Sequence, residues 1–99
     1  MFINELLTSI DYLTYENQKN VEITGICYDS RKVEKGNLFV CIKGYESDGH
    51  KYAQNAIEKG AAAIICEDEI CCDIPKIRVE NSRKALSFIS AFFYAFLNK

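Results

Sequence analysis

Two polar stretches, residues 28–37 and 44–50, contain the side chains that could do chemistry. They include a hydroxyl, two carboxylates and the chain's only imidazole, which belong to Ser30, Asp29, Asp48 and His50. A hydrolase could use such groups as a nucleophile with its base, if the fold brought them together. Simpler roles also fit, since Asp48 is placed to cap a helix and His50 to lie in its first turn. We therefore predict no catalytic residue in this chain.

A phosphate-binding loop is the second chemistry to consider, because residues 44–52 have glycines at the P-loop spacing between a strand and a helix. The other residues do not fit this loop: Lys51 comes one place late, and Tyr52 stands where a magnesium-binding Ser or Thr belongs. Glu46 and Asp48 would also repel a polyphosphate. No G-x-G-x-x-G occurs, so we predict neither an ATP loop nor a dinucleotide site.

The thiols are the third candidate group: Cys27, Cys41, Cys66, Cys71 and Cys72. An odd number of cysteines without an export signal favours reduced thiols over a disulfide framework. The last three could be imagined as a metal cluster. However, no C-x2-C pair exists and the single histidine is distant in sequence, so we predict no metal site.

The remaining chemistry is recognition of a small ligand. The loops at residues 29–37 and 44–49 follow strands predicted at 21–29 and 38–43. If these strands are parallel neighbours, both loops lie at the carboxyl edge of the sheet, where α/β folds bind ligands. Ordinary turns explain the same residues equally well. The groups that could stack on a flat base or hydrogen-bond its edge belong to Tyr28, Tyr45, Ser30, Glu46 and Ser47.

These loops must be positioned by a regular framework, which hydrophobic periodicity predicts. Apolar runs indicate further strands at residues 61–67 and 76–80, and residues 14–20 are polar and turn-like. Apolar residues spaced three and four apart predict helices at 3–10, 50–60 and 82–97, the last with a wide apolar stripe. In the second helix we expect an apolar face of Tyr52, Ala53, Ala56 and Ile57 and a stop at Gly60. We expect a single small layered α/β domain, with a mixed or mostly parallel sheet of four to five strands and flanking helices.

Length and charge limit the remaining function classes. Ninety-nine residues suit one domain, spanning residues 1–99. The net charge of -2 gives no broad basic face for nucleic acid or an anionic membrane. We find no secretory signal and no apolar segment long enough to span a bilayer, so we expect a cytoplasmic protein.

Several motifs closely resemble the amino-terminal domain of the Mur ligases, which add amino acids to the nucleotide-linked precursor of bacterial peptidoglycan. The family pattern runs D-S-R, G-D-L-F-V-A, G and D-G-H, and then G-A-x-A after a helix. It appears here in the same order at residues 29–31, 36–40, 44, 48–50 and 60–63. The tail at residues 79–96 is more similar to the branch that adds the third residue, the UDP-N-acetylmuramoyl-tripeptide synthetases, than to the D-Ala-D-Ala-adding branch.

The resemblance implies that this domain binds UDP-MurNAc-L-Ala-D-Glu, or UDP itself, through the uridine end. By matching positions, the substrate-binding residues are Tyr28, Ser30, Tyr45, Glu46 and Ser47. The same matching implies that Asp29 and Arg31 support the first loop and that Asp48 caps the helix. Because Glu46 is an anion, we expect it to meet the uracil or ribose and not the diphosphate.

In this family ATP, Mg²⁺ and a carbamylated lysine belong to a second domain, and a third domain selects the amino acid. Lys99 stands just before the expected start of the family's G-T-N-G-K-T loop. We therefore expect this chain to hold no cofactor, to be inactive alone and to pack helix 82–97 toward the ATP-binding domain. A free-standing nucleotide-sugar or protein-interaction module, with no ligase role, remains the alternative.

Overall fold

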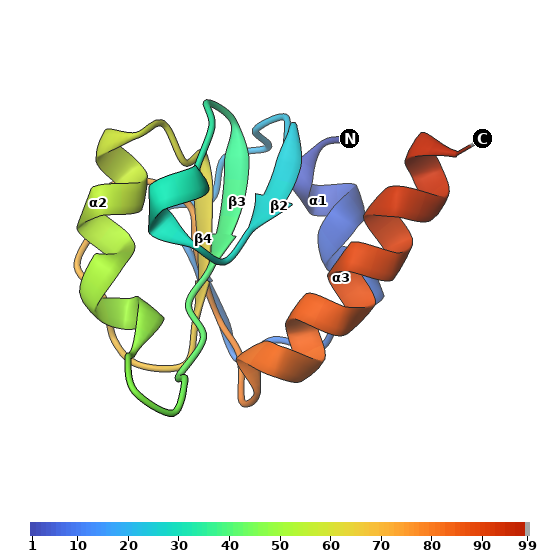
Figure 1. Cartoon of the computed structure of the whole chain (residues 1–99). Helices are drawn as coiled ribbons and strands as arrows, with labels where there is room; N and C mark the ends of the chain where they lie inside the picture. Colours follow the sequence, from blue (N-terminus) through green and yellow to red (C-terminus); the bar gives the residue numbers. More distant parts are fainter. Residues whose placement is uncertain (99) are drawn as a thin grey trace.

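Five short segments form one mixed sheet in the computed structural model, which describes residues 1–98 (Figure 1). The strand order is β1-β5-β4-β3-β2, and every neighbouring pair is parallel except β1 and β5. The bounds are β1 Thr14–Glu16, β2 Gly25–Cys27, β3 Asn37–Val40, β4 Ala63–Cys66 and β5 Lys76–Arg78. The predicted α/β class with a mixed sheet is therefore confirmed.

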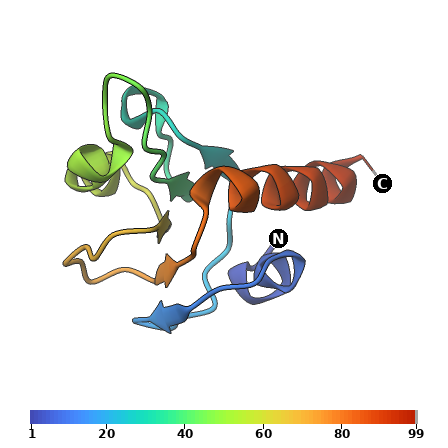
Figure 2. The same ribbon diagram turned by 90° about the horizontal axis from the view of Figure 1, so that it is seen from below.

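Helices cover both faces of the sheet, with α1 and α3 on one side and α2 on the other (Figure 2). Their bounds are α1 Ile3–Leu6, α2 Ala53–Glu58 and α3 Ser82–Leu97. Three single turns of 3-10 helix adjoin them or connect strands: η1 Leu7–Ser9, η2 Ser30–Lys32 and η3 Gly49–Tyr52. Within residues 1–98, no helix is long and apolar enough to cross a membrane.

The central strands are buried on both faces, as their continuous apolar runs predict. Leu38 and Val40 pack into the cluster beneath α1 and α3, whereas Phe39 belongs to the cluster beneath α2. This alternation follows from the two-residue period of a strand. Each such side chain, once fully buried, stabilises the fold by roughly 1.5–3 kcal/mol.

Helix α3 buries only one narrow stripe of its apolar surface. Ala85, Ile89 and Phe93, spaced four residues apart, lie in the core. Other large apolar side chains of the same helix are 37–54 % exposed, namely Phe88, Phe92, Tyr94, Phe96 and Leu97. The predicted wide apolar stripe is therefore present in sequence, but the domain itself covers only part of it.

The carboxyl ends of the parallel strands gather the polar loops at one edge. β2 and β3 are parallel neighbours in register from Gly25↔Asn37 to Cys27↔Phe39, so the condition for the two loops to share one edge is met. Because β4 and β5 run the same way, the segments that follow them reach this edge too. We call it the carboxyl edge and define it as residues 28–31, 43–48, 67–68 and 79–83.

Two details differ from the sequence predictions. Residues 14–16, expected to be turn-like, form β1, because they pair antiparallel with β5. Tyr52, expected on the buried face of its helix, is 43 % exposed, because η3 precedes α2 and shifts the residues that face the sheet. The predicted helix stop at Gly60 is correct: it has φ +108°, which favours glycine, and its N–H donates to Ile57 O at 3.0 Å.

Candidate functional site

The first loop of the carboxyl edge is held by a two-residue ion pair. The Arg31 backbone N–H and side-chain Nε each donate to Asp29 Oδ1 at 3.0 Å, and Nη2 donates to Oδ2 at 2.9 Å. The Arg31 side chain and backbone together lower the pKa of Asp29 to about 2. Beside this pair, Tyr28 is 64 % exposed while Ser30 is buried.

The second loop is a tight turn whose tip projects from the sheet. Lys43 and Asp48 form an isolated antiparallel bridge, and the Gly44 N–H donates to Ser47 O at 2.7 Å. The Gly49 N–H donates to Ile42 O at 2.8 Å, which fixes the return of the chain to β3. Between these anchors, residues 45–47 are exposed, and Tyr45 has no burial at all.

This hydrogen bonding is unlike that of a phosphate-binding loop, which presents free backbone N–H groups to its ligand. Here the amides of Gly44 and Gly49 are used inside the turn. The amide of His50 donates to the Asp48 carboxylate at 2.9 Å. The geometry thus gives a second reason, beyond residue types, for not assigning an ATP loop to residues 44–52.

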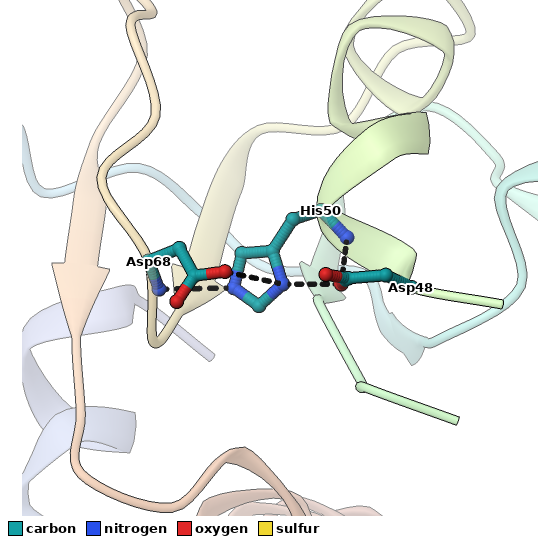
Figure 3. A group of neighbouring side chains, drawn as sticks. All are labelled: Asp48, His50 and Asp68. Atoms are coloured by element: carbon teal, nitrogen blue, oxygen red, sulfur yellow. Dashed lines mark hydrogen bonds and ion pairs between the residues drawn. The ribbon is translucent and has the colours of Figure 1, made fainter. Parts of the chain in front are cut away.

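His50 joins the second loop to the segment after β4 (Figure 3). Its ring Nδ1 lies 2.6 Å from Asp48 Oδ1. Its Nε2 accepts hydrogen bonds from the backbone N–H groups of Glu67, at 2.9 Å, and Asp68, at 3.1 Å. An Nε2 that accepts two hydrogen bonds carries no proton, so a neutral His50 has its proton on Nδ1 and donates it to Asp48. The side chain is only 8 % exposed.

Asp48, His50 and Asp68 have a composition that could hold a metal, and one potential ligand atom of each lies within 4.8 Å of the others. Their hydrogen bonds argue against this use. Both ring nitrogens of His50 are engaged, and the Lys43 ammonium lies 2.8 Å from Asp68 Oδ1. We interpret the cluster as support for the loop.

Charge also favours this interpretation. Burial by itself raises the pKa of Asp48, but hydrogen bonds from the backbone and ring of His50 outweigh it and keep the pKa below its ordinary value. The hydrogen bond to Asp68 raises the pKa of Lys43. The loop therefore ends in an ionised carboxylate and an ammonium that are both paired within the domain.

The same edge continues to the start of α3. Glu67 accepts the Ser82 backbone N–H at its Oε2 at 2.8 Å, and its carbonyl accepts the Arg78 guanidinium at 3.1–3.2 Å. Arg83 Nη2 donates to Lys43 O at 3.3 Å. Sequence reasoning missed these contacts; the only available signal was three acidic residues, Glu67, Asp68 and Glu69, directly after the strand at 63–66.

The five predicted substrate-binding residues lie on two segments that follow neighbouring parallel strands, but they do not form an enclosed pocket among the described cavities. The larger cavity, about 660 Å³, lies elsewhere, between residues 8–13 and 79–88. Ser30 offers little surface, whereas Tyr28 and Tyr45 are open to solvent. Apart from Ser30, these residues lie on an exposed surface.

The thiols are placed as structural groups. Cys27, Cys41 and Cys66 are buried, Cys72 is partly buried and Cys71 is exposed. Burial raises the pKa of Cys66 to about 11 and raises that of Cys41 further. A buried thiol of this kind is neither a ready nucleophile nor a ready metal ligand.

The fold and the edge together define an α/β domain whose polar loops gather where such sheets hold their ligands. The family described as "Mur ligase family, catalytic domain" matches residues 22–94. The chain belongs to the Mur ligase family, and it corresponds to the amino-terminal domain.

Similar proteins refine this placement. The chain is 47% identical over 95 residues to the UDP-N-acetylmuramoyl-L-alanyl-D-glutamate--2,6-diaminopimelate ligase of Bacillus licheniformis, covering 95% of this chain and 20% of that protein. It thus spans about a fifth of this relative's length. The predicted resemblance to the branch that adds the third residue is confirmed.

Solved structures of the D-Ala-D-Ala-adding branch share the fold. A MurF structure from Acinetobacter baumannii matches with a TM-score of 0.79 and 26% identity, over 90% of this chain and 20% of that one. The MurF ligase of Thermotoga maritima, solved in complex with ADP, matches with a TM-score of 0.63 and 30% identity, over 73% of this chain and 17% of that one.

Proposed function

We propose that this chain binds the UDP moiety of UDP-MurNAc-L-Ala-D-Glu, as the substrate-recognition domain of an ATP-dependent ligase that extends the peptidoglycan precursor. Family membership and the name of its sequence relative, a ligase acting on UDP-N-acetylmuramoyl-L-alanyl-D-glutamate, support the proposal. The observation that carries it is the pair of exposed tyrosines on the loops that follow two parallel neighbouring strands, Tyr28 after β2 and Tyr45 after β3.

In this proposal the two rings stack on the uracil or cover the ribose, and polar groups of Ser30, Glu46 and Ser47 bond to the edges of the ligand. Asp29 with Arg31, and Asp48, hold the two loops in place. The Glu46 carboxylate repels phosphate, so the uridine end of the ligand meets the second loop.

ATP and Mg²⁺ would act in another domain of the parent ligase; use of an adenine nucleotide is supported by the related MurF of Thermotoga maritima, which was solved in complex with ADP. There ATP would transfer its γ-phosphoryl group to the precursor's carboxylate and leave as ADP. The amine of lysine or diaminopimelate would then attack the acyl phosphate, forming the amide and releasing phosphate. This chain alone, proposed as the domain of residues 1–99, would bind and not catalyse. Its place is the cytoplasm, where ATP and the nucleotide-linked precursor meet.

The exposed apolar side of α3 is the surface proposed to face the ATP-binding domain. Phe88, Phe92, Phe96 and Leu97 are each more than a third exposed there, on the helix that the family extends toward that domain. A D-Ala-D-Ala-adding parent is the second candidate, which the MurF structural matches favour. The 47% identity to a diaminopimelate ligase favours the first.

The test is an NMR titration of the ¹⁵N-labelled chain with UDP, followed by UDP-MurNAc-L-Ala-D-Glu. We expect shifts confined to residues 28–31 and 44–49, with a Kd on the order of 0.1–1 mM. Tyr45→Ala should weaken UDP binding about tenfold, because it removes one stacking face. Tyr94→Ala, which removes an exposed tyrosine from α3, is the matched control and should bind normally. Absence of shifts at millimolar UDP would contradict the proposal.

A further inference from the structure

The second loop has a firm base and a free tip. Its tip, residues 45–47, is exposed, whereas its first end, Lys43, pairs with Asp68 and its second end, Asp48, is bound by the backbone and ring of His50. A binding loop that is already ordered pays less conformational entropy when a ligand arrives. The groups that order its ends should therefore influence affinity without touching the ligand.

Among the contacts of residues 1–98, only the His50 side chain contacts an end of the second loop and also accepts two backbone N–H groups of the segment after β4. Its Nδ1 meets Asp48, the last residue of the turn, and its Nε2 receives the Glu67 and Asp68 amides. These amides belong to buried or half-buried groups, so their hydrogen bonds are costly to lose.

A chain of contacts then continues to α3. Asp68 pairs with Lys43, at the first end of the turn, and Glu67 binds the Ser82 amide at the start of the helix. Arg83, the next residue of α3, donates to the Lys43 carbonyl. One imidazole thus stands between the second loop and a segment that is itself tied to the helix start.

We propose that His50 is a positioning residue: its neutral imidazole, protonated on Nδ1, holds residues 44–47 in a fixed place relative to residues 67–68 and the start of α3, and so prepares the loop for the UDP moiety. The role in binding rests on the proposed function. The role in ordering the loop does not.

We call the contacts of His50 with Asp48 and with the amides of Glu67 and Asp68 the clamp. Two substitutions separate its two halves. In His50→Gln, the side-chain oxygen can reach the place of Nε2 and accept the Glu67 and Asp68 amides. In His50→Asn, the shorter amide can reach only the place of Nδ1 and donate to Asp48, which leaves the two backbone donors without their acceptor. Ile89→Val shortens a fully buried side chain in the core cluster beneath α1 and α3, and it serves as a control for the effect of stability alone.

We expect His50→Asn to weaken UDP binding about five- to tenfold, and His50→Gln to stay within about threefold of the unmodified chain. The control should bind UDP normally. Heteronuclear NOE values should fall at residues 45–47 in His50→Asn alone, with faster exchange of the Glu67 and Asp68 amides. In the unmodified chain, ring ¹⁵N shifts should show the proton on Nδ1.

Each result decides the question. If the unmodified chain does not bind UDP, the proposed function fails. The NOE and amide-exchange data then still test whether His50 orders the second loop. A loop that stays equally ordered in His50→Asn, or a ring proton found on Nε2, would overturn the inference. So would UDP binding that falls equally in His50→Asn and in the Ile89→Val control, because stability alone would then explain the effect.

Discussion

Replacing Gly49 by Ala should destabilise the domain at the point where the second loop returns to the sheet. A Cβ built at Gly49 would lie 2.7 Å from Ile42 N, 3.1 Å from Ile42 O and 3.2 Å from Cys41 Cα. All three are backbone atoms, and the chain cannot yield there easily, since Cys41 is buried and its N–H donates to Ile65 O at 2.8 Å.

The expected magnitude follows from two opposing effects. Gly→Ala normally stabilises a protein by about 0.4–1 kcal/mol, because it restricts the unfolded chain. Overpacking against atoms that cannot move costs about 1–3 kcal/mol, occasionally more. Contact at 2.7 Å with main-chain nitrogen places Gly49 at the upper end of that cost, so we expect a net loss of about 2 kcal/mol.

Gly44→Ala is the matched comparison within the same loop. Its Cβ would meet Ser47 O at 3.0 Å, in an exposed turn that has room to adjust. We expect a change of less than about 1 kcal/mol in the free energy of unfolding.

Urea unfolding monitored by circular dichroism measures both variants. With an m-value of about 1.3 kcal/mol/M for a chain of this size, the midpoint of Gly49→Ala should fall by about 1.5 M, with m unchanged. A Gly49→Ala midpoint no lower than that of Gly44→Ala would refute the steric argument, because it would mean that the backbone at Cys41 and Ile42 shifts without cost.

Two further outcomes follow from the geometry. The Asp29 carboxyl should titrate near pH 2, because Arg31 lowers its pKa; the ion pair contributes stability above the ordinary pKa of 3.8 and loses it as the pH falls through 2. Carboxyl ¹³C NMR of Arg31→Gln should show this midpoint moving back toward 3.8, and an unmoved midpoint would exclude Arg31 as its cause. Phe93→Ala should cost about 3–5 kcal/mol in thermal unfolding, since the ring is 2 % exposed. Phe92→Ala, at 37 % exposure, should cost clearly less, and equal losses would contradict the placement of α3.

The framework of this domain could be predicted because its signals are local. β3 and β4 are continuous apolar runs, Gly60 ends its helix, and Asn81 caps α3 by accepting the Lys84 amide at 3.0 Å. Parallel pairing of β3 with β4, which α2 connects, then follows from the general rules of α/β topology. These features need only neighbouring residues and a sheet on which to pack.

β1 could not be predicted because its stabilising contacts are distant in sequence. Three residues with a single half-buried tyrosine carry no strand pattern of their own. The strand exists because Tyr15 pairs with Ile77, and because the Asn17 side chain donates to Cys72 O and Ile74 O across 55 and 57 residues. Asn17 itself has φ 53°, a left-handed conformation that asparagine tolerates better than most residues.

The candidate site divides in the same way. Its loops could be predicted from the order of strands and turns. Asp48 and His50 lie in the D-G-H motif, but their contacts with the amides of Glu67 and Asp68, 17 and 18 positions away, could not be predicted from it. At the tip of the second loop, by contrast, the residue type is known but the structure gives it no role in packing. Tyr45 is fully exposed, so packing within the domain supplies no reason for an aromatic ring at that position. The proposed function gives this ring a role, as a face that covers the uridine end of the ligand, and the Tyr45→Ala titration tests that role.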